Sequence, residues 1–377
     1  MSASPGPSIP AGRHRENLFD RLQHFWQRVS EGRRIDDLWS QFAADARASY
    51  GFYERDVDWE EIQNLPRWRR PLHIAKQFFW ALLMKMSPAR RVLLLIASVM
   101  LVISAVQSDR GFEALAAILF LFLLSLELAD KVTMKRDLEI AREIQSWLVP
   151  SKAPEVPGAD IAFATRPQNS VAGDYYDAFY PNADDPERLL VVIADVAGKS
   201  VPAALLMATL QASLHTLAGE KASLADLVAR LNRYTCAHSL GGLRFTTAVL
   251  GEYEPSVRRL TYVNAGHNMP IVRRTNGGIE SLGVGGLPLG IRTDVAYETA
   301  TIALQPGDAL IFFTDGVVEA FNERGEEFGN DRWLGAIRAL PDWNAQETLQ
   351  FLMKRVDEFV GATRQSDDIT CLVFRCK

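Results

Sequence analysis

The chain has 377 residues, of which 48% are hydrophobic and 23% are charged, and this length accommodates two domains or one domain with appendages. The net charge of −5 argues against a nucleic-acid-binding protein, because such proteins concentrate positive charge on one face. The three cysteines, Cys236, Cys371 and Cys376, include no C-x-x-C pair, which argues against a disulfide framework or a zinc site and predicts reduced thiols in a cytoplasmic setting.

The first 90 residues predict a tail and a small helical region. Residues 1–15 are rich in Pro, Gly and Ser, and we expect them to be disordered. No short apolar stretch with a cleavage site occurs near the start, so we expect no signal peptide. Within residues 16–90, apolar side chains recur at helical spacing, beginning with Phe19, Leu22 and Phe25. We interpret this part as a helical cytoplasmic region, to which the sequence assigns no chemistry.

Two uncharged apolar stretches follow, at residues 92–107 and 114–126. Each is somewhat shorter than the ~20 residues that a membrane-spanning helix prefers, and tilt or local thinning of the bilayer compensates for such a difference. Together the two stretches predict a transmembrane helical hairpin over residues 91–128. The alternative is a buried helical hairpin inside a soluble domain.

The charges around these stretches predict an orientation. Lys and Arg residues lie on both outer flanks, whereas the loop at 108–113 contains only Arg110. By the positive-inside rule, both flanks face the cytoplasm. We therefore expect a protein of the inner (cytoplasmic) membrane, with the N-terminus and the C-terminal domain both cytoplasmic.

Residues 129–152 predict a helical connector. Apolar residues recur at helical spacing in a charged segment without glycine, and Pro150 ends the pattern. These apolar residues are Leu138, Ala141, Ile144 and Leu148. Such a stripe could pair with a second copy of the chain, and an unbroken helix suits signal transmission. A plain spacer is equally compatible with the sequence.

The remaining residues, 153–377, predict a separate α+β domain. Runs rich in Val, Ile, Thr and Phe, separated by turn residues, are typical of strands. These runs are ADIAFATRP, LLVVIADV, RFTTAVLGEYE, RRLTYVNAG, MPIVRRT, YETATIAL, ALIFFTDG and ITCLVFRC, and RTNGGIE predicts a hairpin turn. Helical patterns occur in separate blocks at 202–218, 223–238 and 345–360. This grouping favours sheets packed against helices over alternating βαβ units.

Several of the apolar strands end on an acid. LLVVIADV contains Asp195, ALIFFTDG reaches Asp315, and Asp367 and Asp368 directly precede ITCLVF. A carboxylate at such a position must be paired, hydrogen-bonded or bound to a metal. One such acid is usually a turn or cap residue. Three of these sites together predict that the strand ends converge on one acidic pocket.

Carboxylates without His or Cys companions are hard ligands that suit Mg²⁺ or Mn²⁺. Clustered acids repel one another and have raised pKa values unless a cation joins them. Two cations that share a carboxylate and a water lower the pKa of that water from ~15.7 towards 7, which prepares it to attack a phosphoryl group. The acidic pocket therefore predicts two-metal hydrolysis of a phosphate ester.

Several motifs occur in order, and together they resemble the bacterial PPM-type serine/threonine phosphatases of the RsbU and stage II sporulation E group. They include LEIAREIQSWLVP, VAGDYYD (171–177), IADVAGKSVPAALLMATLQA (193–212), YVNAGHNMP (262–270), LPLG (287–290), LQPGDALIFFTDGVVEAFNERGEEFG (304–329) and SDDIT (366–370). The resemblance covers about Asp137 to Lys377 and implies an α-β-β-α sandwich. Two positions depart from the family pattern: Ala172 and Ser200 each replace a usual glycine. Both are small-for-small changes outside the acids.

The resemblance implies roles for the acids, with two Mn²⁺ or Mg²⁺ ions as cofactors. Asp195 matches the bridging carboxylate, and the backbone carbonyl of Val196 matches the neighbouring ligand. Asp315 and Asp368 match the other carboxylate ligands. Asp174 matches the acid that binds a metal water or orients the attacking water, so Asp174 and Asp195 are the candidate catalytic residues.

Four nearby residues have alternative interpretations. We expect Asp177 to be structural and Asp367 to cap a turn or support the ligands rather than bind metal. His267 could act as a general acid for the leaving oxygen, but a Gly-His pair at a tight turn is more often structural. Lys199 could steer phosphate, although a solvated turn lysine is the commoner outcome.

The resemblance thus implies a metal-dependent phosphatase of phosphoserine and phosphothreonine. The usual substrate in this family is a phosphorylated STAS-domain anti-anti-sigma factor in a partner-switching pathway. The family's connector is a dimerising switch, so we expect a homodimer with Ile144 and Leu148 as regulatory positions. The alternatives are a catalytically silent phosphoprotein-binding or scaffold module, and another two-metal phosphodiesterase or nuclease, which the absence of an evident basic groove disfavours.

Overall fold

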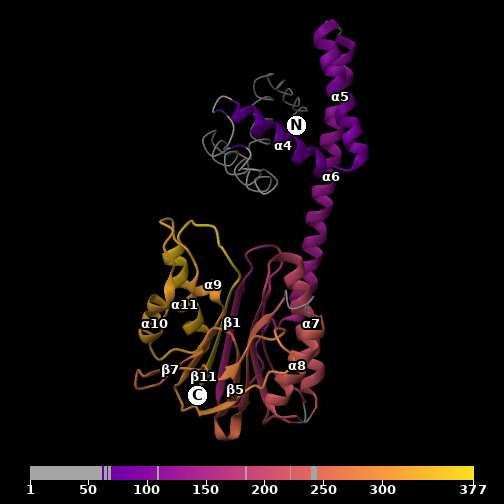
Figure 1. The fold of residues 1–377 in the computed structure, drawn as a ribbon. Coiled ribbons are helices and arrows are strands. Elements are labelled where there is room, and N and C mark those ends of the chain that lie inside the picture. The colour runs from indigo at the N-terminus through magenta and orange to yellow at the C-terminus, as the bar shows by residue number, and fades with distance from the viewer. Residues whose placement is uncertain are drawn as a thin grey trace, which may run out of the picture. The chain divides into compact units, whose positions relative to one another are not determined.

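The computed structural model describes residues 62, 66, 69–107, 110–182, 185–220, 222–238 and 244–377. The chain divides into two compact units, Met1–Ala129 and Asp130–Lys377. Figure 1 shows both units along the chain. The expected tail at 1–15 and most of the helical region expected at 16–90 lie outside the described residues.

The described part of the first unit is helical. Its elements are α4 (Arg70–Lys85), α5 (Pro88–Gln107) and the beginning of α6 (Arg110–Leu148). An ion pair of 3.0 Å between Arg90 Nη1 and Glu127 Oε1 joins α5 to α6. Ala97 and Ala116 are fully buried, which is typical of helices that approach closely through small side chains. The two helices therefore form a hairpin at the predicted place.

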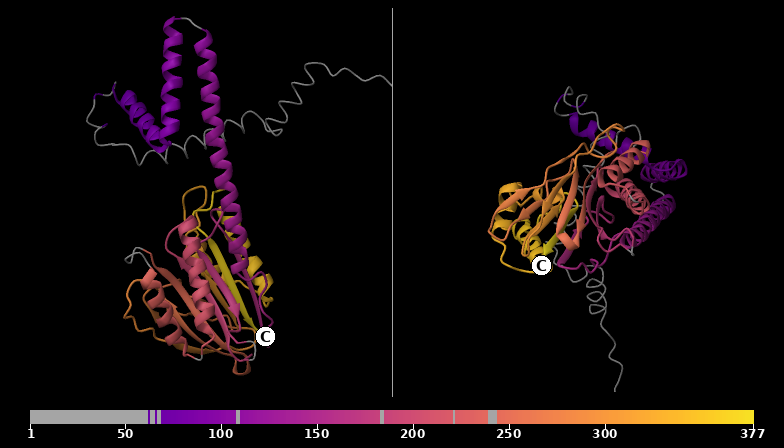
Figure 2. Two further views of the ribbon diagram at one scale, coloured as in Figure 1. Left: turned by 90° about the vertical axis from the view of Figure 1, so that its right-hand side faces the viewer. Right: turned by 90° about the horizontal axis from the view of Figure 1, so that it is seen from below.

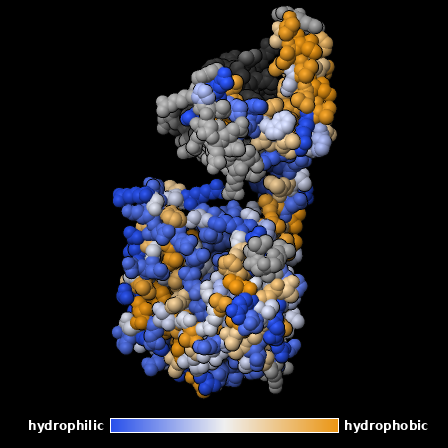
Figure 3. Space-filling view, in the orientation of Figure 1, coloured by the Kyte–Doolittle hydropathy of each residue, from blue (hydrophilic) through white to orange (hydrophobic). Residues whose placement is uncertain are grey.

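The apolar side chains of this hairpin mostly face outward. Val102, Ile118 and Leu124 are each more than 60% exposed, and Figure 3 shows a continuous hydrophobic surface over α5 and the first part of α6. Both helices are long and apolar enough to cross a membrane. A large exposed apolar surface favours a membrane span over a buried hairpin in a soluble domain.

A third helix, α7 (Ser200–Ala218), also meets the length and composition of a membrane span. Its buried residues include Met207, Leu210 and Leu214, which belong to a hydrophobic cluster with strands of the second unit. The apolar character of α7 is therefore explained by packing inside the domain.

The predicted connector is part of a longer helix. α6 runs for 39 residues without interruption to Leu148, and Pro150 follows its end. The second apolar stretch and the connector are thus one helix, as expected from the absence of glycine and proline between them.

The second unit is a sandwich of two sheets with helices on both outer faces (Figures 1 and 2). The first sheet has the order β1-β11-β10-β6-β7, and the second has the order β2-β3-β4-β5-β8 with β9 also paired to β5. The strands of the first sheet are β1 (Ala159–Arg166), β11 (Ile369–Cys376), β10 (Ala309–Phe313), β6 (Ile271–Arg273) and β7 (Ile279–Ser281). Those of the second are β2 (Asp174–Phe179), β3 (Leu189–Val196), β4 (Thr246–Glu254), β5 (Arg259–Ala265), β8 (Gly285–Gly286) and β9 (Ala300–Ala303).

Three hydrophobic clusters correspond to the three interfaces of the sandwich. Side chains that alternate along one strand belong to different clusters: on β10, Phe312 packs between the sheets, whereas Ile311 and Phe313 pack against helices. The outer helices are α7 and α8 (Leu224–His238) on the second sheet, and α10 (Gly329–Arg338) and α11 (Ala345–Val360) on the first. Because both faces of the central strands are buried, these strands are continuously apolar rather than alternating. The predicted α-β-β-α sandwich is confirmed.

The sequence patterns missed some elements. β2 was not expected as a strand, because DYYDAF contains two acids, Asp174 and Asp177, and has no apolar run. The short α9 (Asp315–Val318) and α10 follow turn-rich sequence without a long periodic stripe. The hairpin predicted at RTNGGIE is confirmed: β6 pairs with β7, and Arg274 N donates to Gly278 O at 2.8 Å.

Ser200, the first residue of α7, has a φ of 62°. This left-handed conformation costs a residue with a Cβ about 1–2 kcal/mol, and glycine adopts it without that cost. We predict that Ser200→Gly raises the free energy of unfolding by about 0.5–1 kcal/mol, after the greater freedom of glycine in the unfolded chain is subtracted. Urea titration of the full chain in detergent measures it. Ser200→Ala keeps the strained backbone and is the control. Equal stability of the two variants would contradict the prediction.

Candidate functional site

The two sheets bring acidic residues together at one end of the sandwich. On the second sheet, Asp174 at the start of β2 lies directly opposite Asp195 near the end of β3. Directly opposite residues of an antiparallel pair project from the same face, so the two carboxyl groups are neighbours. The strand-end acid seen in the sequence thus has a partner on the adjacent strand.

The first sheet contributes Asp315 and Asp368. Asp315 follows β10 and begins α9, and Asp368 immediately precedes β11, the antiparallel neighbour of β10. Gly316 makes this approach possible, because a Cβ on it would lie only 1.9 Å from the backbone oxygen of Asp368. The glycine of the TDG sequence is therefore required by the close contact of two backbone segments.

Backbone and hydroxyl groups hold two of these acids in place. The carboxylate of Asp368 accepts hydrogen bonds from the backbone N–H groups of Gln168 and Gly173, both at 2.7 Å. Thr314 Oγ1 donates to Asp174 Oδ2 at 3.0 Å and accepts from the backbone N–H of Thr370 at 3.0 Å. Thr314 therefore links a carboxylate of one sheet to the backbone of the other.

Burial and mutual repulsion raise the pKa values of these acids. Burial, followed by the charges of Asp315, Asp367 and Asp368, raises the pKa of Asp195 to about 7. Burial and then the charge of Asp195 raise the pKa of Asp174 well above its usual value.

The acids from the first sheet are shifted in the same direction. Burial raises the pKa of Asp315, and Asp367 adds to this. Burial also raises the pKa of Asp368, although the N–H groups of Gln168 and Gly173 oppose the shift. A cation would relieve this repulsion by favouring the charged form of every member.

The residues at this site fit a hard divalent cation by their chemistry. All the donors are oxygens, with no His or thiolate in the cluster, which suits Mg²⁺ or Mn²⁺. Within the part of the chain that the structure describes, however, no three His, Cys, Asp or Glu side chains are arranged closely enough to hold an ion as they stand. The carboxylates lie close enough to raise one another's pKa values without forming a closed set of ligands.

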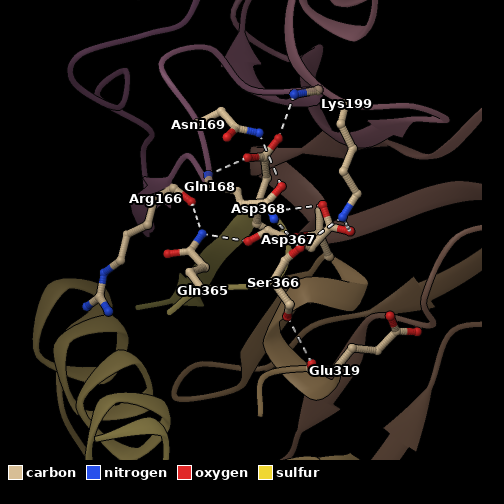
Figure 4. Close-up of polar contacts among 11 residues, drawn as sticks. Arg166, Gln168, Asn169, Lys199, Glu319, Gln365, Ser366, Asp367 and Asp368 are labelled. Atoms are coloured by element: carbon tan, nitrogen blue, oxygen red, sulfur yellow. Dashed lines mark hydrogen bonds and ion pairs between the residues drawn. The ribbon is translucent and has the colours of Figure 1, made fainter. Parts of the chain in front are cut away.

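Asp367 and Lys199 form a supporting layer beside the cluster (Figure 4). Asp367 Oδ1 accepts from the backbone N–H of Asp368 at 2.9 Å, and its Oδ2 pairs with Lys199 Nζ at 2.9 Å. Lys199 Nζ also donates to Ser366 O at 2.8 Å. Asp367 thus caps the backbone N–H of Asp368, in line with the expected capping role. The ammonium group of Lys199 is held by two protein contacts and is not surrounded by solvent only.

His267 and Asp177 have structural partners. His267 is buried, its Nδ1 is hydrogen-bonded to Thr247 Oγ1 at 2.8 Å, and burial lowers its pKa to about 4. It is therefore neutral at pH 7 and poorly suited to donate a proton to a leaving group. Asp177 accepts from Tyr175 Oη and contacts His215 Nε2, each at 2.8 Å.

Two functional contacts were missed from the sequence. Thr314 lies inside a recognised motif, but its hydroxyl bond to the opposite sheet depends on the packing of the sandwich. Gln145, near the end of α6, donates through Nε2 to Ala172 O at 2.7 Å and accepts from Ala172 N at 2.9 Å. The sequence LEIAREIQSWLVP contains Gln145 but gives no signal for this contact. The paired contact ties the connector helix to the segment that carries Gly173 and Asp174.

Comparison with known proteins identifies a family model and relatives that are similar to this domain. A family model described as stage II sporulation protein E matches residues 185–377. The phosphoserine phosphatase RsbU of Bacillus subtilis is 30% identical over 193 residues, covering 51% of this chain and 56% of RsbU. Protein IcfG of Synechocystis is 27% identical over 278 residues, covering 66% of this chain and 43% of IcfG. The chain thus spans about half the length of these curated relatives.

Solved structures share the fold. The SiaA-PP2C domain of Pseudomonas aeruginosa superposes with a TM-score of 0.57 at 22% identity, covering 66% of this chain and 99% of that domain. The PP2C phosphatase domain of the cell fate determinant SpoIIE from Bacillus subtilis gives 0.51 at 19% identity, covering 60% of this chain and 64% of that one. These likenesses agree with the two-sheet sandwich described above.

Thr314 offers a test of the link between the sheets. Thr314→Val keeps the shape but removes the hydroxyl, which leaves Asp174 Oδ2 and the N–H of Thr370 without this partner in a buried site. We predict a loss of about 1–3 kcal/mol in the free energy of unfolding, measured by urea titration. Thr314→Ser retains the hydroxyl and is the matched control with a smaller loss. A valine variant as stable as the native chain would show that the link contributes nothing.

Proposed function

We propose a function from the family of the chain and from the geometry of its site. The chain belongs to the stage II sporulation protein E family. The proposed activity is metal-dependent hydrolysis of phosphoserine and phosphothreonine in proteins. The observation that carries this proposal is the convergence of Asp174, Asp195, Asp315 and Asp368 from both sheets on one edge, where Asp174 is buried and the other three are partly buried. The relative RsbU is a phosphoserine phosphatase, which supports the same reaction class.

The proposed cofactors are two Mn²⁺ or Mg²⁺ ions. Asp195, Asp315, Asp368 and the carbonyl of Val196 would hold them, and the ions would supply an activated water and neutralise the oxygens of the phosphoryl group. The chain's own contribution is positioning: the N–H groups of Gln168 and Gly173 orient Asp368. We assign Asp174 the orientation of the attacking water, with Thr314 fixing its carboxylate.

The proposed substrate is a phosphorylated STAS-domain anti-anti-sigma factor in a partner-switching pathway. The resemblance to the RsbU group supports this substrate class. The relatives RsbU and RsbP of Bacillus subtilis, both phosphoserine phosphatases, support phosphoserine as the group that is hydrolysed. Release of phosphate from a serine-phosphorylated STAS-domain protein, compared with release from an unrelated phosphoprotein, tests this substrate class.

The proposed domain organisation keeps the predicted boundaries. Residues 153–377 form the phosphatase domain, 129–152 the connector, 91–128 the transmembrane hairpin and 16–90 an N-terminal cytoplasmic region after the tail at 1–15. The exposed apolar surface of α5 and α6 supports the inner membrane as location. The basic flanks support a cytoplasmic position for both the N-terminus and the phosphatase domain.

The connector is proposed to form a homodimer and to regulate the site. Of the stripe expected from the sequence, Ile144 is exposed, whereas Leu138 and Ala141 are partly buried. The exposed apolar stripe on α6 consists instead of Ile140, Ile144 and Trp147, which are between 46% and 73% exposed and available for a second copy. Leu148 is partly buried at the end of the helix. Gln145 is hydrogen-bonded to both backbone groups of Ala172, so a rotation of the helix would displace the backbone two residues before Asp174. Such a switch requires two arrangements that differ by only a few kcal/mol.

The metal proposal predicts the effect of removing one anionic ligand. Asp195→Asn should lower turnover of p-nitrophenyl phosphate in Mn²⁺ by roughly a hundredfold or more while the chain remains folded. Asp315→Asn and Asp368→Asn should act similarly, and calorimetric titration should show weaker Mn²⁺ binding in each. Asp331→Asn, an exposed acid on α10, is the control. Full activity in Asp195→Asn would overturn the two-metal mechanism, and a native chain that binds Mn²⁺ without turnover would favour the phosphoprotein-binding alternative.

The membrane proposal predicts the topology. Reporters fused before Ser2 and after Lys377 should both report a cytoplasmic location, and a tag within 108–113 should be accessible from outside. The physical reason is the excess of Lys and Arg on both flanks. Recovery of the full chain in soluble form without detergent would show that the hairpin is a core element.

The connector proposal predicts effects at a distance. Ile144→Asn and Leu148→Gln should change turnover, apparent Mn²⁺ affinity or oligomeric state, although neither residue is a metal ligand. Either direction of change supports the proposal, because either helix arrangement can be the active one. Glu143→Gln, a polar change at an exposed position on the same turn, is the control. If all three properties of the Ile144 and Leu148 variants match the native chain, the connector is only a tether.

A further inference from the structure

A cavity of about 640 Å³ lies at the opposite end of the first sheet from the acidic cluster. The cluster adjoins the first residue of β11 and the last residue of β10, whereas the cavity is lined by Arg375 near the end of β11 and Gly307 before β10. An eight-residue strand spans about 25 Å, so the two sites are separate.

The strand register explains what lines the floor of this cavity. Ala309 of β10 lies directly opposite Arg375 of β11 on one side and Arg273 of β6 on the other. Such cross-strand neighbours project from the same face of a sheet. Ala309 itself is fully buried in a hydrophobic cluster, whereas Arg273 and Arg375 both line the cavity. The register thus brings arginines from two different strands to one cavity.

Neither arginine is fully paired. Arg375 is 5% exposed, and its Nη2 pairs with Asp342, a side chain that is 93% exposed, while its Nη1 is buried without a partner. Arg273 donates through Nη2 to Leu340 O, and its buried Nε has no partner. No carboxylate of the described residues lies within ion-pair distance of Arg273. Buried N–H groups without acceptors, next to a second positive charge, are unfavourable unless an anion joins them.

The adjacent Arg274 shows how this chain pairs a structural arginine. Its guanidinium contacts Glu280 at 2.8 Å and Asp308 at 2.7 Å, and it also donates to Ala303 O at 2.9 Å. The carboxylate of Asp308 is therefore paired with Arg274, and neither residue lines the cavity. Asp160 of β1 lines the cavity and lies directly opposite Arg375. Its carboxylate accepts from the N–H of Ala345 at 3.1 Å and lies 3.9 Å from Lys377 Nζ. The negative groups nearby are thus engaged or exposed, and the buried donors of Arg273 and Arg375 remain.

We propose that this cavity binds a small phosphate-bearing molecule, about the size of a mononucleotide, whose phosphate joins Arg273 and Arg375. The planar guanidinium group matches phosphate oxygens in geometry and charge. The cavity is much larger than a phosphate ion and falls within the ~300–1,000 Å³ typical of small-molecule sites. Trp343 and Pro306 line it as well, and their apolar surfaces suit a ring attached to the phosphate. The exposed Asp342 can leave Arg375 as the anion enters.

The test is calorimetric titration of the full chain in detergent with EDTA, so that divalent cations do not recruit phosphate to the acidic cluster. The probes are inorganic phosphate and AMP. Both should bind, and AMP should bind more tightly. Arg273→Met and Arg375→Met should each weaken binding about tenfold or more, because each removes a charge-assisted pair. Asp195→Asn should bind both probes as the native chain does.

Protein stability provides a second readout that separates binding from misfolding. Both probes should raise the thermal unfolding midpoint of the native chain and of Asp195→Asn, but not of the arginine variants. If an arginine variant fails to fold, Trp343→Ala replaces it and should weaken AMP while leaving inorganic phosphate unchanged. The proposal is overturned if neither probe binds at millimolar concentration, if binding survives in the arginine variants, or if it is lost in Asp195→Asn.

Discussion

The repulsion between carboxylates at the ends of buried strands is the constraint around which this domain is organised. Asp174 and Asp195 face each other on β2 and β3, and Asp315 and Asp368 approach from the other sheet. In a buried site such a group of acids is unfavourable. The strands that carry the acids are packed on both faces and are therefore rigid. Fixed donors also stabilise two of the acids: two backbone N–H groups donate to Asp368, and the hydroxyl of Thr314 donates to Asp174.

These donors compensate for the repulsion only in part. Even with two N–H partners the pKa of Asp368 stays raised, and that of Asp195 reaches about 7. A site that serves structure alone would be expected to match its acids with arginine or lysine. Here Lys199 pairs with Asp367, the neighbour of Asp368. The charge of Lys199 opposes the rise in the pKa values of Asp315 and Asp368 but does not cancel it. A divalent cation would correct the remaining charge imbalance, and this connects the electrostatics of the fold to the proposed chemistry.

The sequence predicted what depends on local pattern and missed what depends on packing between distant segments. Apolar runs that end at Asp195 and Asp315 identified strands and their acidic ends, because burial on both faces leaves a strong compositional signal. Thr314 gave no such signal, since its hydroxyl finds Asp174 only after the two sheets pack. β2 was missed because its acids and tyrosines resemble a loop until their partners on β3 and α7 are known. The row of Arg375, Ala309 and Arg273 is likewise a product of strand register.

The distinction between local pattern and packing also explains which glycines of the family pattern tolerate substitution. Gln145 contacts only the backbone of Ala172, so a methyl group at that position leaves the contact intact. Gly173 is different: a Cβ there would lie 3.2 Å from Val196 O and 3.3 Å from Ala203 Cβ, within the packing that sets the candidate ligands. Ser200 is an intermediate case, because its left-handed backbone is strained for a residue with a Cβ. Substitution thus costs little where only backbone groups make the contact, and it costs local strain at Ser200. At Gly173 it requires Val196 or Ala203 to shift by a few tenths of an ångström beside the acids.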